Sequence, residues 1–147
     1  MLTCIAVYFM GTFLAPALLP QCGTPRPGDP VGPLVLNHLG DQAVSCGRLW
    51  CRSSHELNPS DDQVAKLQRC MATAYREKRS FFFSIEEDGV DSYVATGLMR
   101  RGSGPLQRFW FDSSPSPIPG GPAILVVADC PAPANPERID PFVDCTK

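Results

Sequence analysis

Residues 58–79 read NPSDDQVAKLQRCMATAYREKR, and this stretch predicts the one long amphipathic helix around which the fold is built. Ser60 and Gln63 have the spacing of a capping box, in which each side chain accepts a hydrogen bond from the other residue's backbone N–H. Aspartates in the first turn and arginines and lysine near the last suit the helix dipole. One apolar stripe recurs at helical spacing: Val64, Leu67, Cys70, Met71 and Ala74. Since that stripe needs a partner surface, we expect it to pack on the residues that follow.

Four strand-like segments follow the predicted helix, at residues 80–86, 92–100, 106–112 and 123–129. Turn signals such as Asp88-Gly89 separate them. One helix followed by four strands predicts an α+β domain, with the helix packed on one face of a four-stranded antiparallel meander. This order of elements over residues 61–129 is similar to that of cystatin-like folds, a resemblance that carries no functional residue across.

Aromatic residues occupy both faces of two predicted strands. We expect the face toward the helix to hold Phe81, Phe83, Phe109 and Phe111. Side-chain alternation then places Phe82, Arg108 and Trp110 on the opposite face. That face needs either a cover from the same chain, with Leu34 to Leu36 and Leu49 with Trp50 as candidates, or a partner. Phe82, Arg108 and Trp110 are therefore the candidate residues for binding a protein partner.

The first 21 residues have the composition of an export signal. An apolar run over residues 2–14 precedes Ala15-Pro16-Ala17, which fits a small-residue cleavage site, although no Lys or Arg precedes the run. Alternatively, Leu19-Pro20-Gln21-Cys22-Gly23 resembles a bacterial lipobox, with Gln21 in place of the usual small residue. The lipobox makes Cys22 a lipidation candidate that would anchor the chain to a membrane. The competing interpretation is that Cys22 forms a disulfide.

Residues 22–45 are rich in proline and glycine and predict a tether between the signal segment and a domain over residues 46–147. The domain ends in an irregular, proline-rich tail. The layout of signal segment, Cys22-Gly23, tether and cysteine-bearing domain resembles that of small uncharacterised envelope proteins of Gram-negative bacteria. That resemblance implies a location in the cell envelope, periplasmic or as an outer-membrane lipoprotein, and no activity.

Seven cysteines predict disulfides in an exported chain. Cys4 lies in the signal segment, and no Cys-x-x-Cys motif or zinc-ribbon pattern occurs. Placement favours the bridges Cys46–Cys70 and Cys130–Cys145, while Cys51 competes with Cys46 for Cys70. The disulfide candidates are Cys46, Cys51, Cys70, Cys130 and Cys145, with Cys22 as the sixth if it carries no lipid.

No motif of a known reaction type is present. His38 and His55 lack the spacing of a metal-binding or catalytic pair, and there is no Gly-x-Ser-x-Gly elbow or phosphate-binding glycine loop. A formal net charge of −2 without a basic run gives no indication of nucleic-acid binding. We expect no cofactor and no metal site. We also expect a solvated acidic hairpin tip at Glu86, Glu87, Asp88 and Asp91.

Together these patterns predict a non-enzymatic, exported cell-envelope protein with a structural or binding role. A first alternative is a secreted inhibitor or protein-interaction module that uses the aromatic sheet face. A second is a small hydrolase.

Overall fold

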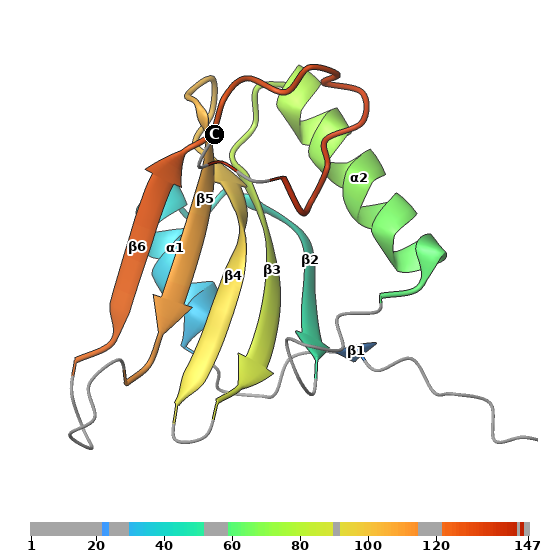
Figure 1. Ribbon diagram of the computed structural model, residues 1–147. Coiled ribbons are helices and arrows are strands. Elements are labelled where there is room, and N and C mark those ends of the chain that lie inside the picture. The colour runs from blue at the N-terminus through green and yellow to red at the C-terminus, as the bar shows by residue number, and fades with distance from the viewer. Residues whose placement is uncertain are drawn as a thin grey trace, which may run out of the picture.

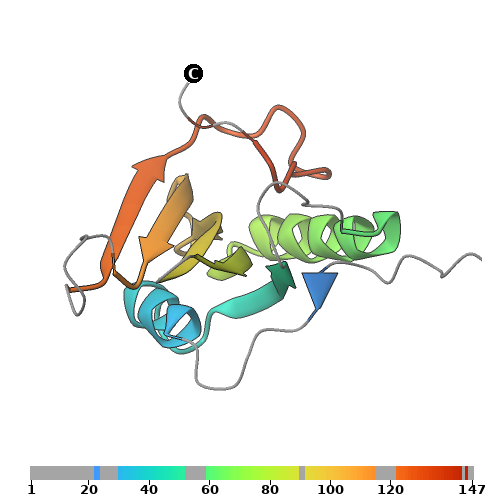
Figure 2. The same cartoon turned by 60° about the horizontal axis from the view of Figure 1, so that its bottom comes forward.

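A six-stranded sheet with one helix on each face makes up the fold, and Figures 1 and 2 show these layers in the computed structural model. The structure describes residues 22–23, 30–51, 59–89, 92–114, 122–143 and 145. The predicted signal segment, residues 1–21, lies outside the described residues, as do His55 and Asp91. The strands follow one another across the sheet in chain order: β1 (Cys22–Gly23), β2 (Val44–Cys51), β3 (Phe81–Asp88), β4 (Tyr93–Arg100), β5 (Leu106–Asp112) and β6 (Ile124–Asp129).

The α+β class is confirmed, whereas the expected four-stranded antiparallel meander is only part of the sheet. Strands β3 to β6 form that meander. Strand β2 pairs with β3 in parallel, and α2 (Asp61–Arg76) connects the two. A parallel pair requires such a crossover, which places α2 against the sheet. The cystatin-like order of one helix before a meander therefore leaves out β2 and the first helix.

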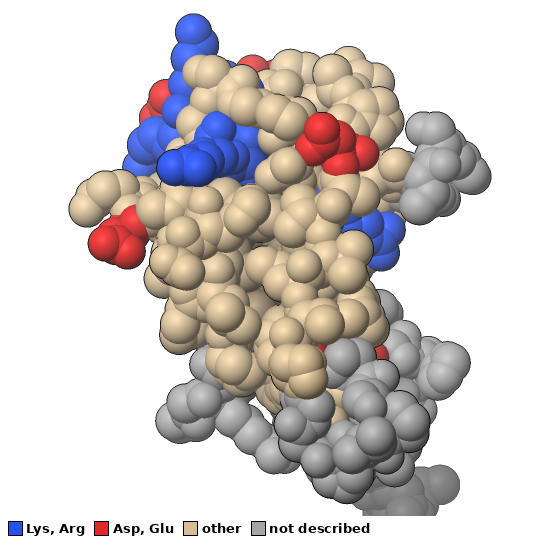
Figure 3. Space-filling model, turned by 90° about the vertical axis from the view of Figure 1, so that its left-hand side faces the viewer, with Lys and Arg blue, Asp and Glu red and all other residues tan. Residues whose placement is uncertain are grey.

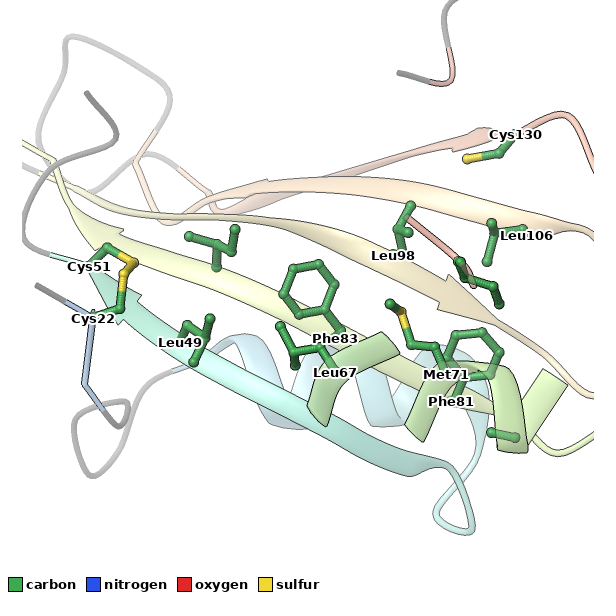
Figure 4. Packing of buried hydrophobic residues seen from close by; sticks show 13 residues of the cluster. Cys22, Leu49, Cys51, Leu67, Met71, Phe81, Phe83, Leu98, Leu106 and Cys130 are labelled. Carbon is green, nitrogen blue, oxygen red and sulfur yellow. A yellow bond between two sulfur atoms is a disulfide. The ribbon is translucent and has the colours of Figure 1, made fainter. Parts of the chain in front are cut away.

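Helix α2 begins where its capping box predicts. The Ser60 backbone donates to Gln63 Oε1 at 2.9 Å, and the Gln63 backbone donates to Ser60 Oγ at 3.3 Å. The helix ends at Arg76, and the chain turns away through Lys78, whose φ of 54° lies in the left-handed region. Figure 4 shows Leu67 and Met71 of α2 packing over Phe81 and Phe83 of β3. This contact confirms that the apolar stripe is the helix's buried side.

The opposite face of the sheet is covered by α1 (Val31–Leu39), which lies within the segment expected to be a tether. Its buried residues Val31, Val35 and Leu39 recur every fourth position, so they share one side of the helix. They cover five buried residues of the sheet, which are Phe82, Ala95, Met99, Phe109 and Phe111. The predicted cover by residues 34–36 is therefore confirmed for Val35 and for the partly buried Leu36, while Leu34 points outward with 38% of its surface exposed. The other predicted cover is wrong for Leu49, which packs in the cluster on the α2 side of the sheet.

The expected assignment of the β5 side chains to the two faces of the sheet is wrong. Register aligns Phe83 with Leu98 and Leu98 with Arg108, so these side chains share the α2 face. Arg108 and Trp110 therefore lie on the same face as α2, and Phe109 lies beneath α1. The register of β5 depends on how the chain returns through residues 101–105, which alternation within one strand cannot specify.

Three disulfides cross-link the chain: Cys22–Cys51, Cys46–Cys70 and Cys130–Cys145. The two predicted bridges are confirmed, and the open competition for Cys70 is decided in favour of Cys46. Cys51 instead pairs with Cys22, which joins β1 to the end of β2. A sulfur in this bridge cannot also carry a lipid, so bridge and lipidation are mutually exclusive states of Cys22. Three bridges indicate an oxidising compartment.

Candidate functional site

Part of the α2 face of the sheet has no cover in the described structure. Helix α2 packs on β2 and β3, and the tail that follows β6 crosses only one end of the sheet (Figure 1). Three large apolar side chains are exposed in this region: Trp110 at 39%, Val126 at 52% and Phe142 at 43%. Trp110 and Val126 are cross-strand neighbours. We call these three residues together with Arg108 the Trp110 surface.

A small pocket of about 70 Å³ opens between Arg108 and Phe142 of this surface. Strands β3, β4 and β5 form its floor and the tail forms its rim, with Phe83, Ile85, Thr96, Gly97, Arg108, Pro141 and Phe142 as its lining. Binding sites for drug-sized molecules are roughly 300–1,000 Å³. The pocket is therefore sized for one side-chain group of a larger partner.

Arg108 is the only charged residue that lines this pocket in the described structure. Its Nη1 donates to the Val143 carbonyl oxygen at 3.2 Å. Among the described residues no carboxylate forms an ion pair with Arg108, in contrast to Arg48 with Glu86 and Arg76 with Glu137. A guanidinium has five N–H donors, so donors remain for a ligand. The pocket therefore favours an anionic group within apolar surroundings.

The tail is fixed at several points, and these hold Phe142 at the rim. Ile139 is 1% exposed and belongs to the buried cluster that also contains Leu67 and Met71 of α2. The Asp140 carboxylate accepts from the Phe142 backbone N–H at 2.9 Å, an Asx turn that sets the direction of the chain. An ion pair of 2.9 Å joins Glu137 to Arg76 of α2, and the bridge Cys130–Cys145 closes the loop. Phe142 is thus presented by an anchored segment.

A second cavity, of about 380 Å³, lies under the tail. Its apolar wall comes from Leu106, Ile139 and Val143. Two of its polar groups are engaged in turns, because Asn135 Oδ1 accepts from the Glu137 backbone and Asp140 from the Phe142 backbone. Arg138 also lines this cavity, but none of the large exposed apolar side chains of the described residues does. We therefore place the candidate site at the Trp110 surface.

Glu86 is not part of a solvated hairpin tip, which corrects the expectation from the sequence. Its side chain is 0% exposed and accepts from Arg48 Nε at 2.7 Å and Arg48 Nη2 at 2.8 Å. Ser84 Oγ donates to Oε1 at 2.5 Å, and the Tyr93 hydroxyl donates to Oε2. This arrangement ties β2, β3 and β4 together. Side-chain alternation along β3 places Glu86 on the same buried face as Phe82 and Ser84, so its burial could have been predicted. Its partner Arg48 could not, because it lies 38 residues away in the sequence.

The structure brings together two of the three predicted partner-binding residues. Arg108 and Trp110 both lie at the Trp110 surface. Phe82 is 2% exposed beneath α1, so its side chain is not available to a partner. His38 is exposed in the last turn of α1.

Within the described residues, no group of three or more His, Cys, Asp or Glu side chains is placed to hold a metal ion. None of the described helices has the length and hydropathy needed to cross a membrane. Comparison of the chain with protein-family models, with curated proteins and with solved structures finds no match.

Proposed function

We propose that this chain is an exported, non-enzymatic protein of the cell envelope or the external medium that binds a protein partner through the Trp110 surface. The observation that carries the proposal is the exposure of Trp110, Val126 and Phe142, each by more than a third, on the face where Arg108 and Phe142 line a pocket and Trp110 pairs with Val126. Trp and Arg are over-represented among the residues that dominate binding energy at protein interfaces. Contiguous exposed apolar groups rimmed by polar residues often mark protein-interaction sites.

The pocket at Arg108 indicates the chemistry of the partner. A carboxylate that enters between Phe83, Ile85 and Phe142 would meet the guanidinium in surroundings that exclude water. Charge-assisted hydrogen bonds of this kind are about twice as strong as neutral ones. We expect the partner to insert an Asp or Glu side chain here, with apolar residues on both sides that contact Trp110 and Phe142.

Export is supported by the bridges and by the predicted signal segment. Disulfides persist in secreted, periplasmic and cell-surface proteins and are rare in the cytosol. Two endings of the signal segment fit this proposal. Cleavage after Ala17 leaves Cys22 free to pair with Cys51, and lipidation at Cys22 leaves Cys51 without that partner.

Replacing Trp110 with serine, or Arg108 with glutamine, is expected to reduce partner capture at least tenfold without unfolding the domain. Truncating one of the few residues that dominate a protein interface costs roughly 2 kcal/mol or more, and about 1.4 kcal/mol is a factor of ten in affinity. Purified wild type, Trp110→Ser and Arg108→Gln would be immobilised and exposed to envelope extract and culture medium of the producing cells, with captured proteins quantified by mass spectrometry.

Leu34→Ser is the matched control, since Leu34 is 38% exposed on the opposite side of the molecule. It should capture the same partner as wild type. Equal capture by wild type and both site variants would contradict the proposal. If Trp110→Ser unfolds by near-UV circular dichroism, Arg108→Gln alone decides, because Arg108 makes one hydrogen bond within the described chain.

The intact mass of the mature protein, measured before and after reduction, is expected to show three bridges and no lipid. Reduction of the bridges at Cys22, Cys46 and Cys130 adds six hydrogens. A chain that begins at Cys22, carries the mass of acyl chains and gains only four hydrogens would instead show that the lipoprotein form exists. That outcome would replace the Cys22–Cys51 bridge and leave the proposed binding surface intact.

A further inference from the structure

The outer edge of β6 is built to pair with another strand, and we infer that its partner is β6 of a second copy of this chain, in antiparallel orientation. This inference concerns self-association: it shares Val126 with the Trp110 surface but does not rest on the partner proposed there. Strand β6 is the last strand of the sheet, so one of its edges has no neighbour in the described structure. In both ribbon views it forms one outer side of the molecule (Figures 1 and 2).

The hydrogen bonds between β5 and β6 identify which backbone groups of β6 face away from the sheet. The Cys130 backbone N–H donates to the Leu106 carbonyl at 2.8 Å. In an antiparallel pair, alternate residues exchange hydrogen bonds with the neighbour, so Ala128, Val126 and Ile124 also face β5. The N–H and C=O groups of Leu125, Val127 and Asp129 therefore face away from the sheet. These three residues supply three donors and three acceptors to any strand alongside.

Strand β6 lacks the features that normally block such pairing. It reads Ile-Leu-Val-Val-Ala-Asp and contains no Lys, Arg or Pro. Natural sheets protect their edges with these residues, with bulges or with a covering segment. Figure 3 looks onto this side and shows a broad uncharged surface, with basic side chains gathered toward one end. The edge therefore presents an open strand that is apolar except for Asp129 at its end.

Self-pairing fits this strand in a symmetric register. A two-fold axis at Val127 places Val127 opposite its own copy and Leu125 opposite Asp129 of the copy. All outward-facing backbone groups of the three residues then find partners, and no charged residue faces a like charge. Pro122 and Pro131 stand just outside the strand, so pairing stops at its ends. Asp129 is the one charged residue of this edge and stands opposite Leu125 of the copy, so the edge is self-complementary and favours a second copy over a strand rich in acidic residues.

Pairing would also explain the exposure of Val126. In this register Val126 lies opposite Ala128 of the second copy, on the same face as Trp110. Cross-strand apolar pairs are the unit by which sheets gain stability. Two copies thus form one continuous sheet, in which the Trp110–Val126 row of one copy continues into the Ala128–Arg108 row of the other. The most exposed apolar residue of the strand, at 52%, becomes partly covered.

Sedimentation velocity of the purified chain over a wide concentration range is the first test. We expect a monomer–dimer equilibrium, and Val126→Lys should raise the dissociation constant at least tenfold because two lysines then approach the axis. Val126 is half exposed, so the substitution leaves the monomer folded. Leu34→Lys places the same change at an exposed apolar residue of α1 and should leave dimerisation unchanged. A monomer at all concentrations, or a dimer insensitive to Val126→Lys, overturns the inference.

Amide hydrogen exchange followed by NMR tests the register. The amides of Val126 and Ala128 should be protected at every concentration. Those of Leu125, Val127 and Asp129 should exchange rapidly in dilute solution and slow at least tenfold where the dimer dominates. Rapid exchange of these three amides in the dimer overturns strand pairing. Arg108→Gln should not alter either measurement, so failure of this inference and failure of the proposed partner site can be told apart.

Discussion

Replacing Arg48 with methionine is expected to lower the free energy of unfolding by about 3–5 kcal/mol. The substitution leaves the Glu86 carboxylate fully buried without the guanidinium that binds both of its oxygens, at 2.7 and 2.8 Å. Ser84 and Tyr93 still donate to Glu86, but neither carries a positive charge. Breaking a buried pair by removing one partner is costly because the remaining charge is uncompensated. Urea unfolding with the disulfides intact measures the loss.

Two variants make this prediction specific. Lys66→Met breaks the ion pair between Lys66 and Asp62, whose side chains are 67% and 69% exposed, respectively. This substitution should change the free energy of unfolding by less than ~0.5 kcal/mol. The double variant Arg48→Met with Glu86→Leu removes both charges and should recover most of the stability lost in Arg48→Met. An Arg48→Met variant as stable as Lys66→Met would show that the Arg48–Glu86 pair contributes nothing net.

Replacing Gly97 with alanine is expected to destabilise the domain by at least ~3 kcal/mol, the upper part of the range for overpacked cores. A Cβ atom at this position would lie 1.9 Å from the Phe83 carbonyl oxygen and 2.8 Å from the Phe109 ring. The first of these is backbone in the neighbouring strand, so no side-chain rotation relieves the overlap. Strands β3 and β4 would have to separate near their middle.

Thr96→Ala is the control for this prediction, because it lies next to Gly97 in β4 and points to the opposite face. It loses one hydrogen bond of 3.3 Å to the Phe109 carbonyl oxygen and should cost only about 1 kcal/mol. Thermal and urea unfolding of both variants give the comparison. If both variants unfold at the same temperature and urea concentration, the sheet accommodates the extra methyl group of Gly97→Ala without a large loss of stability.

The elements that the sequence predicted are those specified by neighbouring residues. The capping box at Ser60 located the start of α2, and alternation with turn signals located all four strands of the meander. Helix α1 was missed because Gly32 and Pro33 suggested a tether, although Val31, Val35 and Leu39 have helical spacing. The parallel pairing of β2 with β3 was missed because nothing local distinguishes a strand that pairs across a crossover from one that ends in a loop.

In the candidate site, too, the sequence predicted what neighbouring residues specify and missed what distant residues decide. Alternation within β5 correctly grouped Arg108 with Trp110, but it could not place the pair on a face, because register between strands decides that. Phe142 carried no signal, since it lies in an irregular tail that is positioned by Asp140, Glu137 and a bridge. The partner of Glu86 was likewise not predictable, because Arg48 lies in a different strand.

The connectivity of the first two bridges has a consequence for how the protein matures. Cys46 lies inside the loop closed by Cys22–Cys51, and Cys51 lies inside the loop closed by Cys46–Cys70, so the two loops are interleaved. A chain delivered N-terminus first into an oxidising compartment would present its cysteines in sequence, and pairing of successive cysteines would join Cys22 to Cys46. Reaching the native arrangement then requires thiol–disulfide exchange. Production of the native protein should therefore depend on a disulfide isomerase as well as an oxidant.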